Sequence, residues 1–292
     1  MPSSKAPLLN RPMALPAAPR PGLWALLRVP RRVPLVMGIV NVTPDSFFPD
    51  SRVLGPQEAA DRVLRQVEEG ADLVDIGGQS TRPGSEPVSE DCELKRLVPV
   101  FEKLAGRSKV PLSVDTDKAA VARRCLEAGA TILNDVSALR QDERMIEAAQ
   151  GAEAVILMHR GGTSPKTMQD CPQYGDVVHE VRDFLTQQRE VFRRAGGDAT
   201  RLLYDPGIGF GKSVAHNLAL LKDVDIFSDL GPVVLGCSRK AFLGGEGPQD
   251  RLEGSLAVAC WAALRGVKIL RVHDVRATQK ALKALNAVLG AS

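Results

Sequence analysis

Short runs of aliphatic and β-branched residues alternate with longer helical patterns from residue 35 onward, as in a parallel α/β fold. These runs predict eight strands, at 35–40, 72–76, 111–115, 131–135, 154–158, 201–205, 232–236 and 268–272. The segments between them include PQEAADRVLRQVEEG, DKAAVARRCLEAG and SLAVACWAALRG. Each of these three has apolar residues at the spacing of one buried helical face and ends in a glycine, which favours a helix C-terminus.

Eight strand–helix units are the number that a single TIM barrel requires. We therefore predict one (β/α)8 barrel over residues 23–292, preceded by a short disordered extension at residues 1–22. A doubly wound sheet remains the alternative fold, because periodicity does not show whether a sheet closes. A barrel would place the chemistry at the C-terminal ends of the strands and in the loops that follow them.

The first 22 residues are rich in proline, alanine and arginine and lack the unbroken apolar core of a secretory signal. An organelle transit peptide is the alternative to simple disorder, but the prolines oppose the amphipathic helix that it needs. The next segment, LWALLRVPRRVPL, has alternating apolar positions and predicts a short hairpin before the barrel.

Composition narrows the class of protein. A hydrophobic fraction of 44% is typical of a soluble globular protein, and no apolar run approaches the roughly 20 residues of a membrane span. The net charge is +3, but the first 36 residues hold six basic residues and no acidic residue, which leaves −3 on the rest. This slightly acidic body predicts no nucleic-acid partner. Five cysteines without a Cys-x-x-Cys pair predict a reducing, cytoplasmic location.

Chemically distinctive residues follow all eight predicted strands. In chain order they are Asn41, the segment GGQSTRPGS, Asp115, Asn134 with Asp135, Met158 with His159, Asp205, the segment CSRK, and Arg271 with His273. Any one of them, taken alone, is equally consistent with an ordinary helix-cap or turn residue. Together they indicate a single polar face at one end of the barrel.

Two chemical types meet at this face. Carboxylate and amide groups suit the edge of a flat heterocycle, and they are Asp115, Asn134 and Asp205. The cationic groups suit a phosphate or carboxylate of the substrate; they are Arg82, Arg239, Lys240, Arg271 and His273. Ion pairing inside the protein is the alternative for the arginines. The amide oxygen of Asn41 suits Mg²⁺, which takes few protein ligands. The residues therefore indicate a heterocycle that bears phosphate.

Three loops add to this picture. NVTPDSFFPDSRVLGP and GGQSTRPGSEP are long for strand-to-helix connections and rich in Gly, Pro and Ser, as in loops that close over a substrate. Plain surface connections are the alternative. YDPGIGFGKS looks like a phosphate-binding loop, but Pro206 stands where that motif has its first glycine. We therefore assign no phosphate to Lys212.

Eight motifs run in order through residues 35–285: MGIVNVTPDSF, DIGGQSTRPGS, SVDTDKAAVA, ILNDVSA, LMHRGGTSPKTMQ, DPGIGFGK, CSRKAFLG and RVHDV. Together they resemble the dihydropteroate synthases of folate biosynthesis. The resemblance implies a pterin-binding transferase that condenses (7,8-dihydropterin-6-yl)methyl diphosphate with 4-aminobenzoate, with Mg²⁺ as cofactor. It also implies a homodimer, for which the late apolar helices and Trp261 would supply a face. The mechanism it implies is departure of diphosphate, then capture of the pterin cation by the arylamine.

The resemblance also implies roles for individual residues. The pterin ring would be held by Asp115, Asn134, Met158, Asp205 and Lys240. Arg271 would contact both the ring and the diphosphate, and Asn41 and His273 would lie at the magnesium and diphosphate end. The 4-aminobenzoate pocket and the loops around it would be formed by Asp45, Phe47, Thr81, Arg82, Pro83 and Phe210. Catalysis would then rest on Asp115, Asp205, Lys240 and Arg271, with no covalent nucleophile.

Two positions depart from the family pattern. Ala241 stands where many members have a serine that can bond the 4-aminobenzoate carboxylate, so we expect weaker affinity for that substrate or an altered sulfonamide response. Gln79 stands where glutamate is usual, and the sequence alone predicts no effect of this change.

Two other functions remain open. One is a pterin-dependent methyltransferase of the same barrel group, against which the Ser-Arg-Lys and Arg-Val-His sequences argue. The other is a catalytically silent pterin-binding paralogue that acts through subunit association.

Overall fold

A computed structural model describes residues 20–43, 55–80, 86–162 and 172–291. Its sheet consists of parallel strands, each within two residues of a predicted one. They are β1 (Leu35–Asn41), β2 (Leu73–Gly77), β3 (Leu112–Asp115), β4 (Ile132–Asp135), β5 (Ala154–Met158), β6 (Leu202–Asp205), β7 (Val234–Leu235) and β8 (Ile269–Val272).

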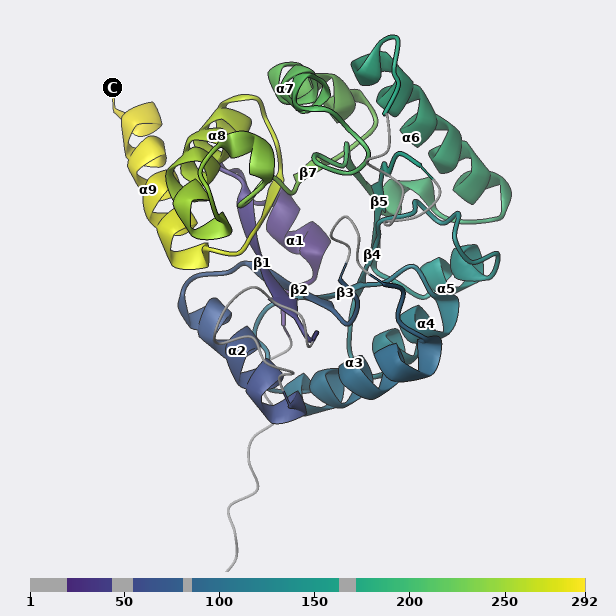
Figure 1. Ribbon diagram of the computed structural model, residues 1–292. Coiled ribbons are helices and arrows are strands. Elements are labelled where there is room, and N and C mark those ends of the chain that lie inside the picture. Colours follow the sequence, from purple (N-terminus) through teal and green to yellow (C-terminus); the bar gives the residue numbers. More distant parts are fainter. Residues whose placement is uncertain (1–19, 44–54, 81–85, 163–171, 292) are drawn as a thin grey trace, which may run out of the picture.

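The strands form a ring. Their order is β6-β5-β4-β3-β2-β1-β8-β7, and a parallel bridge between Tyr204 and Val233 joins the two outermost strands. Every strand therefore lies beside its neighbour in sequence, whereas a doubly wound sheet reverses its order partway. The predicted (β/α)8 barrel is confirmed, and Figure 1 shows the helices arranged around the outside of the ring.

The outer helices follow the strands in turn. They are α2 (Pro56–Glu68), α3 (Glu90–Leu104), α4 (Ala119–Glu127), α5 (Met145–Gln150), α6 (Val177–Arg194), α7 (Val214–Lys222), α8 (Leu252–Leu264) and α9 (Val275–Gly290), with short 3₁₀ turns at Ala199–Arg201, Val224–Asp229, Ala241–Leu243 and Pro248–Arg251. The predicted glycine terminators behave as expected. Gly70, Gly129 and Gly266 follow α2, α4 and α8 with φ of +102°, +118° and +79°, a conformation that glycine adopts without steric cost.

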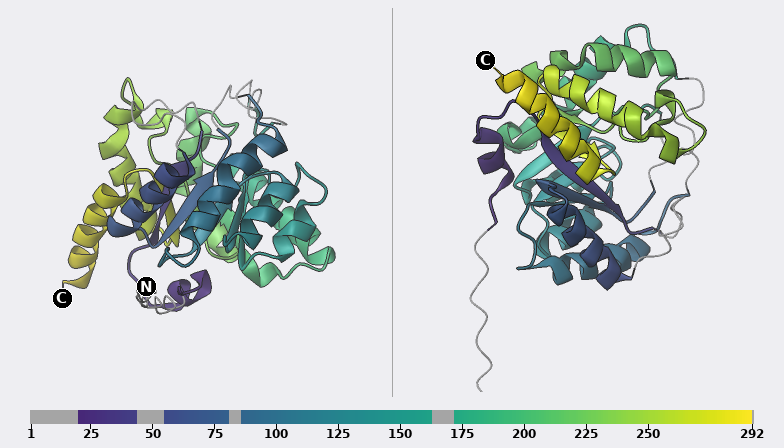
Figure 2. Two further views of the ribbon diagram at one scale, coloured as in Figure 1. Left: turned by 90° about the horizontal axis from the view of Figure 1, so that it is seen from below. Right: turned by 90° about the vertical axis from the view of Figure 1, so that its left-hand side faces the viewer.

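The segment predicted as a hairpin is instead a helix, α1 (Leu23–Arg28). Leu23, Leu26 and Leu27 are spaced three and four residues apart, so one helical face presents all three to the barrel. Trp24 adds a hydrogen bond from its indole nitrogen to the carbonyl of Glu153, at 3.0 Å. Figure 2 shows α1, in purple, beneath the barrel at the end where the strands begin.

The inner face of the barrel changes character along its axis. At the N-terminal end it is apolar and forms one cluster with Leu23 of α1: Leu35, Met37, Leu73, Ile132, Ala154, Ile156, Leu203, Val234 and Ile269. Side chains alternate between the two faces of a strand, so the next inward positions lie two residues further on. Those positions include Asp75, Asn134, Asp205 and Arg271. The N-terminal half of the ring is therefore packed, and its C-terminal half is lined with polar groups.

Among the residues that the structure describes, no helix is both long and apolar enough to cross a membrane. The boundary predicted between residues 22 and 23 stays a prediction, because residues 1–19 lie outside the described residues.

Replacing Leu23 by Ala should lower the free energy of unfolding by about 2–5 kcal/mol, because this side chain fills the floor of the barrel with no exposed surface. Val29 follows the same helix but is 52% exposed, so Val29→Ala should change stability by less than about 0.5 kcal/mol. Urea unfolding of both variants measures the difference. Equal stabilities of Leu23→Ala and the parent protein would show that α1 does not support the barrel.

Candidate functional site

Arg271 organises the C-terminal mouth of the barrel. It lies on β8, and its Nε and Nη2 atoms donate to Asp75 of β2 and Asp115 of β3, both at 2.6 Å. The same Asp75 oxygen accepts a hydrogen bond of 2.9 Å from the side-chain amide of Asn134 on β4. Four strands therefore contribute to one hydrogen-bonded group, which the pairing of β8 with β1 brings together.

The charges of this group are unbalanced, because two carboxylates share one guanidinium. Burial, together with the neighbouring Asp75, raises the pKa of Asp115 to about 8 against the attraction of Arg271. Burial also opposes the charge of Arg271, but the two carboxylates outweigh it and raise the pKa of the guanidinium. The site therefore holds a permanent cation next to a carboxyl group that exchanges its proton near neutral pH.

Asp205 ends β6 and faces the same mouth. Its Oδ1 accepts a hydrogen bond of 2.7 Å from the backbone N–H of Gly207. Its Oδ2 and the side chain of Arg271 both lie within 4 Å of the point where a β-carbon on Gly236 would stand. Burial raises the pKa of Asp205 to about 6, while the Gly207 N–H and the nearby cations lower it. At neutral pH this side chain is a buried acceptor.

The glycines of the YDPGIGFGKS segment have a steric explanation. Gly207, Gly209 and Gly211 have φ of +69°, +82° and +66°. A β-carbon on Gly207 would overlap the carbonyl oxygen of His159, and one on Gly211 would lie 2.7 Å from the α-carbon of Gly161. Backbone therefore packs on backbone in this turn, which follows Asp205 and contains Phe210.

Lys212 has an internal role, as expected from the failed phosphate-binding motif. Its Nζ donates to the carbonyls of Gly207 and Phe210, at 2.9 and 3.1 Å, and lies 2.8 Å from Nδ1 of His159. Burial lowers the pKa of Lys212 to about 7. Burial, with Lys212 as the next cause, lowers the pKa of His159 to about 2, so the imidazole is a neutral acceptor. The lysine ties the loops after β5 and β6 together.

An apolar wall stands beside these polar groups. Met158 at the end of β5, Phe210 and Val136 pack into a small buried cluster. The Nζ atom of Lys240 lies 4.1 Å from the centre of the Phe210 ring, a cation–π arrangement that sets the ammonium at the edge of the wall. Ala241 follows directly and begins the 3₁₀ turn Ala241–Leu243, with its side chain exposed.

The opposite rim carries Asn41 and His273. The Oδ1 atom of Asn41 lies 3.7 Å, and Oδ2 of Asp115 3.6 Å, from the position that a β-carbon on Gly77 would take. Nδ1 of His273 lies 3.2 Å from the hydroxyl oxygen of Ser238. These groups are therefore placed near the mouth, as the sequence predicts.

Arg239 forms an ion pair inside the protein, which was the alternative to binding a phosphate or carboxylate. Its Nε donates to Asp274 at 2.8 Å, and its Nη2 also bonds that carboxylate. The backbone of Arg239 has φ of +59°, and its N–H donates to the hydroxyl of Ser255 at 2.9 Å. The CSRK segment thus presents Lys240 to the site, while Arg239 fastens the segment to the residue before α9.

Five predicted site residues lie outside the described residues. They are Asp45, Phe47, Thr81, Arg82 and Pro83. Their roles stay predictions.

Asp75 and Val136 are the site residues that sequence reasoning missed. Asp75 stands inside a buried strand rather than after it, and its side chain has no exposed surface. The sequence did carry a signal for Asp75, because a charged residue among Leu, Val and Ile in a buried strand needs a polar or charged partner. Val136 gave no signal, since an apolar residue after a strand is indistinguishable from core.

This arrangement suits a flat, polar heterocycle. Carboxylate and amide oxygens provide acceptors, and an amide and an ammonium provide donors. Met158, Val136 and Phe210 provide apolar contact, and Arg271 supplies a cation that can also face an anion. No hydroxyl or thiol among the groups described above is placed as a nucleophile.

Comparison with known proteins supports a site for a flat, polar heterocycle. The model of the family described as "Pterin binding enzyme" matches residues 37–273. The chain is 42% identical over 262 residues to dihydropteroate synthase of Escherichia coli K12, covering 88% of this chain and 93% of the relative.

Solved structures give the same result. That of Yersinia pestis dihydropteroate synthase with a sulfonamide drug complex has a TM-score of 0.84 at 43% identity, covering 89% of this chain and 95% of the other. That of Xanthomonas albilineans dihydropteroate synthase with 4-aminobenzoic acid has a TM-score of 0.82 at 46% identity, covering 89% and 94%. The chain therefore belongs to the dihydropteroate synthase family of pterin-binding enzymes.

Proposed function

We infer that this protein is a dihydropteroate synthase. It condenses (7,8-dihydropterin-6-yl)methyl diphosphate with 4-aminobenzoate to give 7,8-dihydropteroate and diphosphate, a step of folate biosynthesis. The observation that carries this inference is the group of Asp75, Asp115, Asn134 and Arg271 at the mouth of the barrel, facing Asp205. It combines acceptors for a heterocycle with a largely buried cation. A relative from Xanthomonas albilineans has been solved with 7,8-dihydropteroate, which supports the same chemistry here.

We propose that the pterin ring lies among Asp115, Asn134, Asp205 and Lys240. A pterin edge carries adjacent N–H donors and ring-nitrogen acceptors, and buried carboxylates and an amide match them in a water-poor site. Met158 would pack on the ring face. A mismatched heterocycle would leave these buried groups unpaired, which is how such a site achieves specificity.

The reaction breaks the bond between the pterin methylene carbon and the diphosphate oxygen. The diphosphate leaves with the electron pair, and conjugation with the ring spreads the positive charge that remains. Asp115 and Asp205 would stabilise that charge, while Arg271 and His273 would offset the charge growing on the leaving group. The amine of 4-aminobenzoate then forms the new carbon–nitrogen bond and loses a proton. The fixed charges are already in place, so the site need not reorganise as the bond breaks.

We propose Asn41 as the residue that holds magnesium. Its amide oxygen is a hard ligand near the carboxylate of Asp115, and Mg²⁺ is commonly bound by one or two protein oxygens together with substrate phosphates and water. In the described part of the chain no group of three or more His, Cys, Asp or Glu could hold a metal alone, so the diphosphate would provide further ligands. When bound, the ion would neutralise charge on the diphosphate.

We also propose that 4-aminobenzoate binds beside Phe210, with Asp45, Phe47, Thr81, Arg82 and Pro83 completing its pocket. The support in the described residues is the position of Phe210, whose ring packs with Met158 and Val136 and also contacts the ammonium of Lys240. An aromatic side chain there can pack on a benzene ring.

A homodimer is the proposed assembly, formed through the outer faces of α7 and α8. Val214 and Leu218 lie one turn apart on α7 and are 57% and 53% exposed, and Trp261 and Leu264 on α8 are 43% and 56% exposed. The indole N–H of Trp261 donates to the carbonyl of Leu221 at 2.9 Å, so the two helices present one surface. A two-fold axis would pair this patch with itself, the commonest arrangement in soluble oligomers.

The proposed location is the cytoplasm. Cys92, Cys125, Cys237 and Cys260 are free thiols in the part of the chain that the structure describes. Burial raises the pKa of Cys125 and of Cys237 to about 12, so these thiols are unreactive. Free cysteines suit a reducing compartment.

The function is tested by incubating the protein with the pterin diphosphate and Mg²⁺, with and without 4-aminobenzoate. Diphosphate release should require 4-aminobenzoate and should equal the 7,8-dihydropteroate formed, as measured by a coupled assay and by chromatography. Pterin binding without turnover would contradict the inference and favour the silent paralogue. Release of a methyl group from methyl-tetrahydrofolate would favour the methyltransferase.

Arg271→Lys should lower kcat by about 10²–10³-fold, because a single ammonium cannot bond Asp75 and Asp115 in this geometry and still face the leaving group. Arg193→Lys is a matched control on α6, where Arg193 bonds only the i−3 residue Glu190 among the contacts described. Its kcat should stay within about twofold of the parent value. Equal rates for the two variants would remove Arg271 from the mechanism.

Leu218→Arg should convert the proposed dimer to a monomer, because a charge would be buried in the interface. Val29→Arg is the control, since Val29 is equally exposed, at 52%, but lies at the floor of the barrel. Sedimentation velocity measures the mass of each variant. A monomeric parent protein, or a dimer that survives Leu218→Arg, would contradict this interface.

A further inference from the structure

Lys212 is a buried lysine whose hydrogen bonds go to neutral groups. The residue is 4% exposed, and its three nearest acceptors are Nδ1 of His159 and the carbonyl oxygens of Gly207 and Phe210, at 2.8, 2.9 and 3.1 Å. An ammonium has three N–H donors, so these contacts can use all of them. Among the contacts of the described residues, none joins this ammonium to a carboxylate.

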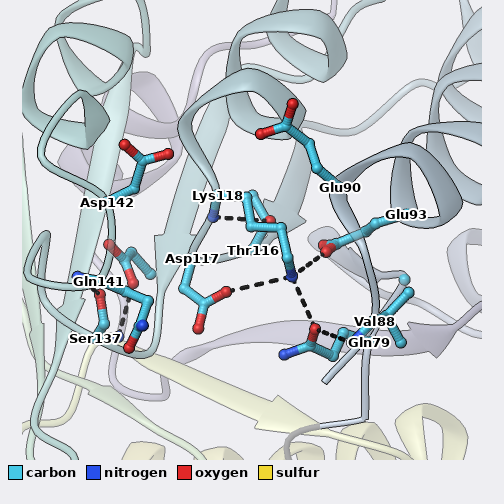
Figure 3. Close-up of polar contacts among 12 residues, drawn as sticks. Gln79, Val88, Glu90, Glu93, Thr116, Asp117, Lys118, Ser137, Gln141 and Asp142 are labelled. Atoms are coloured by element: carbon cyan, nitrogen blue, oxygen red, sulfur yellow. Dashed lines mark hydrogen bonds and ion pairs between the residues drawn. The ribbon is translucent and has the colours of Figure 1, made fainter. Parts of the chain in front are cut away.

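Lys118, just before α4, shows the arrangement that is usual for a lysine inside a protein. Its ammonium lies 2.7 Å from Glu93 and 3.6 Å from Asp117 (Figure 3). Charged groups are almost never fully buried unless they are paired. Lys212 departs from this rule, and the carboxylate whose charge acts on it without a direct bond is Asp205.

The carbonyls that Lys212 meets have other donors. That of Gly207 also accepts from the backbone N–H of Phe210, and that of Phe210 accepts from the N–H of Gly161, both at 3.2 Å. Neither carbonyl would be unpaired without the lysine. Removing an ammonium from water is costly, so the pairing of these carbonyls does not by itself account for a cation at this position.

The turn that Lys212 holds is connected to the proposed pterin site. Gly207 donates its own N–H to Oδ1 of Asp205, at 2.7 Å. The carbonyl of Asp205 accepts from the N–H of His159, at 3.0 Å. Phe210 contributes its ring to the apolar wall. Lys212 therefore restrains the neighbours of Asp205 on two sides, and it restrains the backbone of Phe210 directly.

The charge of Lys212 also acts on Asp205. Burial raises the pKa of Asp205 to about 6, while the N–H of Gly207 and the cations Arg271, Lys240 and Lys212 lower it. Burial lowers the pKa of Lys212 to about 7, against the attraction of Asp205. The ammonium is therefore charged in the pH range where Asp205 takes up its proton, and it opposes that protonation.

The other titratable groups around this pair are mostly cationic or neutral. They are Arg140 after β4, His159 after β5, Tyr174 before α6, His216 on α7, Cys237 and Lys240 after β7, and Arg271 on β8. Burial lowers the pKa of His159 to about 2, raises that of Cys237 to about 12 and also raises that of Tyr174, so these three are neutral between pH 5 and pH 8. No member of this set adds a carboxylate.

We propose that Lys212 is a positioning residue for pterin binding. Its ammonium fixes the turn that follows Asp205 and contains Phe210, and its charge favours the carboxylate form of Asp205. The inference rests on the proposed function, in which Asp205 accepts hydrogen bonds from the pterin.

Lys212→Met keeps a long, unbranched side chain but removes the charge and the donors. Calorimetry with the hydroxymethyl dihydropterin from pH 5 to pH 8 should show the fall in affinity beginning about one pH unit higher than in the parent protein, because loss of a nearby cation raises the pKa of a carboxyl group. At pH 8 the lysine of the parent is largely uncharged. The affinity of the variant there should be about 3–10-fold weaker, which reports the lost hydrogen bonds alone.

Lys212→Gln separates the charge from the hydrogen bonds, because its amide keeps two N–H donors without a charge. It should shift the pH dependence as Lys212→Met does, with an affinity at pH 8 within about twofold of the parent value.

Tyr174→Phe is the matched control. The hydroxyl of Tyr174 donates to the carbonyl of Gly211 in the same turn, at 3.1 Å, so this variant removes a neutral hydrogen bond and leaves the charge of Lys212 in place. Its affinity should stay within about twofold of the parent value at every pH.

A role confined to stability would lower the free energy of unfolding without moving the pH dependence of affinity. An unshifted pH dependence in Lys212→Met and Lys212→Gln would therefore overturn the proposal, as would an equal shift in Tyr174→Phe. Failure of both Lys212 variants to fold would overturn it too, because the barrel itself would then need the lysine. Absence of pterin binding by the parent protein would instead refute the proposed function.

Discussion

A largely buried guanidinium, with 18% of its side chain exposed and shared by two carboxylates, is the constraint on which the site depends. Removing the charges of Arg271, Asp75 and Asp115 from water is costly, and the cost is offset only where the hydrogen-bond geometry is good. Here the three groups come from β8, β2 and β3, and the parallel pairing of β8 with β1 brings the last strand within reach of β2 and β3. This pairing is therefore a condition for the chemistry as well as for stability.

The two halves of the barrel interior have different roles. The N-terminal half, with α1 as its floor, is packed with apolar side chains and contributes stability. The C-terminal half carries buried groups whose pKa values are displaced from their ordinary range, as at Asp115 and Asp205. Such groups are costly to fold, and the packed half supplies the stability that this requires. A rigid floor also keeps the polar groups above it in register with a flat substrate.

Local sequence patterns predicted most of the fold but fewer of the hydrogen-bond and ion-pair partners. Strand positions followed from alternation and helix ends from glycine, whereas α1 was wrongly expected to be a hairpin, because a spacing of three and four residues in a short leucine-rich segment also resembles alternation. The residues after the strands were found because their types were unusual there. Asp75 was missed inside its strand, and the partner of Arg239 could not be foreseen, because Asp274 is 35 positions away and only the fold brings it near. Gln79 likewise accepts hydrogen bonds from Val88 and Lys118, partners that only the fold brings near.

The central claim is that the polar half of the barrel binds a pterin, and its most direct test is the affinity for the hydroxymethyl dihydropterin without diphosphate. Calorimetry from pH 5 to pH 8 should show affinity falling as the pH drops below about 6, because burial raises the pKa of Asp205 to about 6 and the protonated acid accepts poorly. Asp205→Asn should bind about 10–100-fold more weakly at pH 7.5 and should lack the fall in affinity below about pH 6, keeping only the dependence near pH 8 that Asp115 contributes. Equal affinity of Asp205→Asn and the parent protein at pH 7.5 would contradict the account.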